Sequence, residues 1–172
     1  MAARGRCAKG TLDHAPPGPL SSDRGGRIYA QTLIWSETSK PGRTFESSAM
    51  FELPNSERRM PDAAWISDDR LAGFDVNDEG IWEICPDFIV EVRSVSDQLH
   101  DQQANMKMWV SQDALLAWLV DPYEEAVWVY RPEQEPELLE HPESLTATEI
   151  ADDLTIDFSR IWPRHDPEPE TS

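Results

Sequence analysis

The sequence lacks several features that define common protein classes. No stretch approaches the ~18 consecutive apolar residues of a transmembrane helix, which argues against a membrane-spanning protein. Only two cysteines, Cys7 and Cys85, are present, too few for a disulfide framework or a zinc site of cysteines alone. The first residues lack the apolar segment of a secretory signal, and no glycine-rich phosphate-binding loop occurs. These absences predict a cytoplasmic protein with no membrane partner.

Positive charge is also scarce. The 172 residues include 15 Lys and Arg against 33 Asp and Glu, a formal net charge of −18. Residues 1–60 hold nine basic and six acidic side chains, whereas residues 61–172 hold six and 27. Because nucleic-acid binding normally needs a basic face, this balance argues against a protein that coats DNA or RNA.

Much of the acidity lies near the C-terminus, interleaved with prolines. This pattern indicates a solvated flank, and a DNA-mimicking or partner-docking surface is the alternative. The acidic residues of this flank are Glu133, Glu135, Glu137, Glu140, Glu143, Asp166, Glu168 and Glu170.

What the sequence does contain is enough apolar material for one folded domain. Hydrophobic residues make up 39% of the chain and include seven tryptophans, so wholesale disorder is excluded. Glycines and prolines without hydrophobic periodicity predict a loop-rich or disordered leader over residues 1–20. We expect a single domain over 21–162 and a disordered acidic tail over 163–172.

The hydrophobic spacing within the domain predicts both helices and strands. Helices are expected over residues 21–39 and 97–110. Strands are expected near Phe45, at 50–53, 62–66, 86–93, 115–120 and 126–130, with an edge strand at 138–139 and a core-closing segment at 154–162. The predicted class is α/β or mixed α+β, with one mixed β-sheet flanked by helices.

Two acidic residues lie in or next to predicted strands, where burial of a carboxylate costs desolvation free energy. Asp62 follows a proline at the start of a short strand, and Glu91 lies inside the otherwise apolar strand over 86–93. Alternation with a period of two places Glu91 on the same face as Ile89 and Arg93. A carboxylate within a core strand needs a cation or hydrogen bonds to offset its desolvation.

Two interpretations of Glu91 remain open on this pattern. In one, Glu91 pairs with Arg93 or Lys107 and is structural. In the other, Asp62 and Glu91 lie on adjacent strands and bind Mg²⁺, which takes few carboxylates and keeps several waters. A metal held there would activate water and stabilise charge on a phosphate.

Longer motifs carry a more specific resemblance. The sequence resembles the Uma-two family of putative restriction endonucleases, within the PD-(D/E)XK nuclease superfamily, from about residue 21 to residue 162. The similar segments are Phe45–Ser48, Phe51–Asn55, Pro61–Trp65, Cys85–Ser94, Ser96–Asp97, Gln103–Ala104, Trp118–Pro122, Val129–Pro132 and Asp157–Trp162.

The resemblance implies a restriction-endonuclease-like core that hydrolyses DNA phosphodiester bonds with Mg²⁺ or Mn²⁺. Asp62 and Glu91 match the two metal-binding acids of the family, and Glu46 is a weaker candidate for a third. Asp87 belongs to the turn that enters the strand. Because many nucleases of the superfamily act as dimers, a homodimer is an expectation of the same kind.

The sequence departs from the family pattern at the catalytic lysine. The family places this lysine on the helix after the Glu strand, where this chain has Asn105. At about 100° per residue, Lys107 points roughly 200° away from Asn105 and cannot simply replace it. Arg93 or Lys107 would contact phosphate, although Arg93 does not transfer protons, and Asn105 would help place a water. The resemblance therefore implies either a slowed endonuclease or an inactive nuclease-fold module that binds or assembles. It also implies that relatives carry further structured chain before residue 18.

Overall fold

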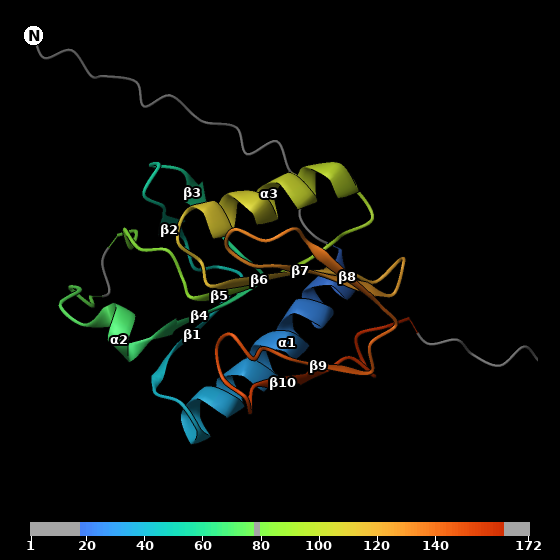
Figure 1. The fold of residues 1–172 in the computed structure, drawn as a ribbon, viewed down its shortest axis with the longest axis horizontal. Coiled ribbons are helices and arrows are strands. Elements are labelled where there is room, and N and C mark those ends of the chain that lie inside the picture. The colour runs from blue at the N-terminus through green and yellow to red at the C-terminus, as the bar shows by residue number, and fades with distance from the viewer. Residues whose placement is uncertain (1–17, 78–79, 164–172) are drawn as a thin grey trace, which may run out of the picture.

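The computed structural model describes residues 18–77 and 80–163, and within them it contains three helices and ten strands (Figure 1). The fold is a mixed α/β fold built on a six-stranded sheet in the order β1–β4–β5–β6–β7–β8. Only β5 and β6 are parallel, and the other neighbours in this sheet are antiparallel. The sheet strands are β1 (Gly42–Glu46), β4 (Ala63–Ser67), β5 (Phe88–Val92), β6 (Leu116–Asp121), β7 (Ala126–Tyr130) and β8 (Glu137–Glu140).

Helices cover both faces of this sheet. Helix α1 (Pro19–Thr38) lies on one face, together with the small hairpin of β9 (Ser144–Thr146) and β10 (Thr155–Asp157), and α3 (Leu99–Ser111) lies on the other (Figure 1). The predicted mixed sheet flanked by helices is therefore confirmed. Helix α3 provides the crossover that parallel neighbours such as β5 and β6 require.

The two faces of β5 separate the core into two clusters. Phe88, Val90 and Val92 pack with Ile28 and Trp35 of α1 in the first cluster. Ile89 packs in the second cluster, with Met106 and Trp109 of α3. The period-two alternation predicted for this strand is thus confirmed. Glu91 consequently leaves the strand on the face that α3 covers.

Three short elements were not predicted: strand β3 (Arg58–Arg59), strand β9 and the one-turn helix α2 (Asp68–Leu71). Strand β2 (Phe51–Glu52), which pairs with β3 in a hairpin, lies within the strand predicted at 50–53. Two- and three-residue strands and single helical turns are too short to show hydrophobic periodicity. A local cap holds α2, because the Ser67 hydroxyl accepts a hydrogen bond from the Arg70 backbone N–H.

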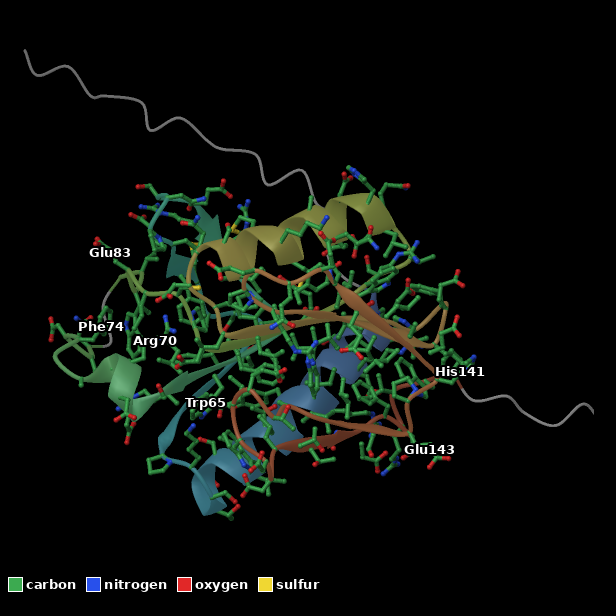
Figure 2. All side chains as sticks on the ribbon, in the orientation of Figure 1. Trp65, Arg70, Phe74, Glu83, His141 and Glu143 are labelled. Atoms are coloured by element: carbon green, nitrogen blue, oxygen red, sulfur yellow. The ribbon has the colours of Figure 1, made fainter. Side chains whose placement is uncertain are left out.

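An ion-pair cluster centred on Arg70, a residue of α2 labelled in Figure 2, ties this helix to the entry of β5. Arg70 donates to Asp87 (2.6 Å) and to Asp113 (2.8 Å), and Asp87 is buried. Asp87 also accepts from the Ser67 backbone N–H at 2.7 Å. Asp87 therefore has the structural place at the strand entry that the sequence predicted.

The limits of the domain can be compared only within the described residues. Helix α1 begins at Pro19, inside the segment expected to be a loop-rich leader, and Ile161 closes the core as predicted. The expectations for residues 1–17 and 164–172 lie outside the described residues.

The described part of the acidic flank is exposed, as predicted for a solvated surface. Its exposed acids are Glu133, Glu135, Glu137, Glu140 and Glu143. No helix in the described ranges has the length and apolarity needed to cross a bilayer.

Candidate active site

Adjacent strands bring Asp62 and Glu91 together. In the antiparallel pairing of β4 with β5, Ala63 lies opposite Val90. One residue further along this register, Asp62 lies opposite Glu91, at the end where β5 leaves the sheet. The predicted juxtaposition of these two acids on neighbouring strands therefore occurs.

The backbone of β5 and helix α1 hold Asp62 in place. Its Oδ2 accepts a hydrogen bond of 2.7 Å from the Val92 backbone N–H. Gly25 of α1 lies against it, since a Cβ atom placed on Gly25 would be 3.4 Å from the Asp62 Cβ. Burial raises the pKa of Asp62 to about 6, a change that the Val92 N–H opposes and the negative charge of Asp97 favours.

Helix α3 supplies the hydrogen bonds to Glu91. Its Oε1 accepts from the Asn105 side-chain amide at 3.2 Å and from the Trp109 indole N–H at 3.3 Å. Burial raises the pKa of Glu91 to about 8, and the neighbouring Asp62 carboxylate raises it further against the effect of these hydrogen bonds. Ionising both acids at once is therefore unfavourable in this poorly solvated place unless a cation lies beside them.

No cation among the described residues forms an ion pair with either acid. Arg93, which directly follows β5, instead pairs with Asp121 at 2.8 Å, and Asp121 is fully buried. Arg93 also donates to the Asp97 carbonyl and lies over the Tyr123 ring. The interpretation in which Glu91 pairs with Arg93 or Lys107 is therefore not what the structure shows.

The donor set suits a hard divalent cation. Two carboxylates that repel each other and lack a counter-ion provide oxygen ligands of the kind that Mg²⁺ and Mn²⁺ prefer. Within residues 18–77 and 80–163, no group of three or more His, Cys, Asp or Glu side chains could hold a metal. Glu46 is exposed at the end of β1, where it accepts hydrogen bonds from Ser47 and Ser48. Any metal here would take two protein carboxylates and complete its shell with water or substrate.

Two comparisons bear on this arrangement. The sequence profile of the Uma2 family, described as "Putative restriction endonuclease", matches residues 5–159. The chain belongs to the Uma2 family. The family resemblance predicted from the sequence is thereby confirmed.

A solved structure shares the fold of this Uma2 protein. It is the crystal structure of a "putative nuclease belonging to DUF820" from Anabaena variabilis, with a TM-score of 0.72. The match covers 85% of this chain and 82% of the other, at 20% sequence identity, and so shows the fold alone. A comparison with curated proteins finds no match.

The structure separates Asn105 from Lys107, as the helical geometry predicted. Asn105 faces Glu91 from α3, whereas the Lys107 side chain is exposed. Lys107 lines an open hollow of about 730 Å³, between the end of α3 and the loop after β7, with Pro54 and Arg131. The side chain that α3 directs at Glu91 from position 105 is therefore an uncharged amide, and Lys107 lines a separate hollow.

Sequence reasoning missed two residues that shape the site. Neither Trp109 nor Gly25 was singled out from the sequence as a site residue. Trp109 follows Asn105 by four residues, so the two lie on the same helical face, and this spacing was the available signal. Gly25 gave no such signal, because its contact with Asp62 joins residues far apart in the sequence.

Proposed function

We propose that this Uma2 protein is a metal-dependent endonuclease that hydrolyses DNA phosphodiester bonds at the Asp62–Glu91 pair. The observation that supports this best is that Asp62, directly before β4, lies opposite Glu91 of β5, and that both acids have raised pKa values and no cationic partner among the described residues. Family membership and the shared fold support the same class of reaction.

Asp62 and Glu91 would hold Mg²⁺ or Mn²⁺. When bound, such an ion supplies Lewis-acid stabilisation of charge on a phosphate and activation of water. The Val92 N–H directs one Asp62 oxygen, and Asn105 and Trp109 direct one Glu91 oxygen. Such outer hydrogen bonds fix the orientation of metal-binding carboxylates.

Asn105 sets the expected rate. An amide can orient a water through its hydrogen bonds but cannot offset the charge that develops on a phosphate. Loss of one such stabilising group typically slows an enzyme by about 10²–10³-fold. We therefore propose slow cleavage. The same observation favours the second candidate, an inactive nuclease-fold module that binds or assembles.

Cleavage of supercoiled plasmid with Mg²⁺, Mn²⁺ or EDTA tests the proposal. We expect slow nicking with either metal, none with EDTA, and loss of activity in Asp62→Asn and Glu91→Gln. Asp101→Asn, which removes an exposed carboxylate on α3, is the matched control and should cut like wild type. If Mn²⁺ binds at Asp62 and Glu91 but the protein cuts neither plasmid nor short duplexes, the enzyme proposal is wrong.

Asn105→Lys separates the two candidates. A gain in nicking would show that the rest of the site is competent, as the endonuclease proposal requires. Unchanged inactivity with an intact fold and retained Mn²⁺ binding would favour the binding or assembly module.

A further inference from the structure

We propose that Arg24, Arg27 and Arg160 form a surface that binds the phosphate backbone of a nucleic acid beside the Asp62–Glu91 pair. This inference rests on the proposed function, because it names where the substrate is held. The sequence had assigned phosphate contact to Arg93 or Lys107. Asp121 neutralises the first of these, and the second faces a different hollow.

Arg24 is the centre of this surface. It lies on α1 with 8% of its surface exposed, and its Nε donates a hydrogen bond of 2.9 Å to the Ile161 carbonyl. In the part of the chain that the structure describes, no carboxylate forms an ion pair with it. Because buried arginines are nearly always paired, the remaining guanidinium N–H groups provide donors for an anion.

Two adjoining hollows give an anion access to these groups. Their volumes are about 350 and 320 Å³, and both are lined by Arg27, Arg160 and Ile161. Arg24 lines the second hollow. The guanidinium groups therefore reach open surface between α1 and the turn that follows β10, rather than being covered by protein.

The local charge is positive although the chain is strongly acidic. Three arginines line the hollows against two carboxylates, Asp23 and Asp157. Arg27 forms two hydrogen bonds with Asp23, at 2.8 and 3.1 Å. Arg160 is exposed and has no ion-pair partner among the described residues. Guanidinium groups match phosphate oxygens in geometry, so a phosphodiester backbone suits this surface.

Helix α1 connects this surface to the candidate active site. Gly25, the residue after Arg24, lies against Asp62, and a Cβ atom there would be 3.9 Å from the Asp62 Oδ1. The residue that follows Arg24 therefore lies beside this carboxylate, at van der Waals distance for a Cβ atom. A backbone held by the arginines can extend along α1 towards the acids.

The test measures binding of a labelled duplex DNA by fluorescence anisotropy over a range of salt concentrations. EDTA is present, so binding does not depend on cleavage. The variant is Arg27→Gln with Arg160→Gln, and the control is Arg58→Gln with Arg59→Gln, which removes the same charge from the exposed β3 hairpin. Thermal melting confirms that each variant is folded.

We expect the Arg27 and Arg160 variant to bind DNA more weakly, with the slope of log Kobs against log[salt] reduced by about two, one for each lost phosphate contact. The control should keep the wild-type slope. Equal slopes in the two variants, or no DNA binding by wild type, would overturn the inference. Equal competition by polyglutamate would assign the surface to acidic polypeptides and would also overturn it.

These outcomes are separable from those of the proposed function. Arginine-dependent binding without metal-dependent cleavage would leave the surface intact and reject the endonuclease. Cleavage that depends on Asp62 and Glu91, with DNA binding unaffected in the arginine variant, would support the endonuclease and reject the arginine surface.

Discussion

Glu91 is a carboxylate in a core strand, and its surroundings favour its protonated form. Asn105 and Trp109 donate hydrogen bonds to it, but burial and the neighbouring Asp62 raise its pKa to about 8. A carboxyl group with a raised pKa binds its proton more tightly in the folded than in the unfolded state. Its contribution to stability is fully present below the unfolded pKa and is lost as pH rises through the folded pKa.

Glu91→Gln should therefore change how stability depends on pH. Without divalent cations, the wild-type free energy of unfolding should fall as pH rises from 4.5, the ordinary pKa of a glutamate side chain, towards about 8. Glutamine keeps an oxygen for the two donors but has no charge, so the variant should gain on the order of a few kcal/mol over wild type across this window. Melting temperatures in EDTA measure this, with the exposed Glu140→Gln as control. Parallel pH curves for Glu91→Gln and wild type would contradict the prediction.

The hydrogen bond from Trp109 to Glu91 can be tested by its effect on metal affinity. Trp109→Phe keeps an aromatic ring in the core but removes the N–H that directs Glu91, so Mn²⁺ affinity should fall about 10–100-fold. Trp118→Phe is the matched control, because the buried Trp118 indole N–H has no hydrogen-bond partner in the described part of the protein. Titration calorimetry measures both affinities. Equal losses in the two variants would assign Trp109 a packing role alone.

Among the elements, the parallel pair β5 and β6 is joined at its end by an ion pair in addition to its backbone ladder. Arg93 follows β5, and its 2.8 Å contact with Asp121 joins it to the last residue of β6. Asp121 also accepts hydrogen bonds from the backbone N–H groups of Tyr123 and Glu124, which shape the turn into β7. Arg93 thus has a structural role that its position in the motif did not indicate.

Arg93→Met should destabilise the fold strongly. It leaves a fully buried carboxylate without its cation, which typically costs about 3–5 kcal/mol. Addition of Asp121→Asn removes that charge and keeps the oxygen that caps the turn, so the double variant should recover part of the loss. Urea denaturation of the four proteins in this cycle measures the coupling. Wild-type stability in Arg93→Met would show that the pair contributes little.

At the scale of the whole molecule, a formal net charge of −18 places many carboxylates on one small surface. Their mutual repulsion opposes the compact state, although individual ion pairs such as Arg27–Asp23 favour it. Repulsion should outweigh these pairs, because exposed ion pairs contribute only about 0–1 kcal/mol each.

Salt should consequently stabilise the protein. Raising NaCl from ~0.02 to ~0.5 M shortens the screening length several-fold and weakens the repulsion, so the melting temperature should increase. Sucrose at matched osmolality is the control for effects other than screening. A melting temperature that falls with NaCl would mean that the attractive pairs dominate.

The sequence by itself predicted the class of fold, the strand that carries Glu91, the family and, through the family resemblance, the pairing of Glu91 with Asp62. These features rest on local signals: alternation with a period of two, prolines and motif spacing, all of which can be read along the chain. The same signals placed Asn105 and Lys107 on different sides of α3. Strands β3 and β9 and the single-turn helix α2 escaped prediction because so few residues cannot display a period.

Only the tertiary structure decided which groups surround the two acids. Trp109 donates a hydrogen bond to Glu91 as well as packing in the core. Gly25 lies against Asp62, and Arg93 forms its ion pair with Asp121 and not with Glu91. Arg24 donates a hydrogen bond to the carbonyl of Ile161, 137 residues away in the sequence. Hydrogen bonds and ion pairs of this kind depend on distance in space, and periodicity along one segment carries no information about which distant segment will pack against it.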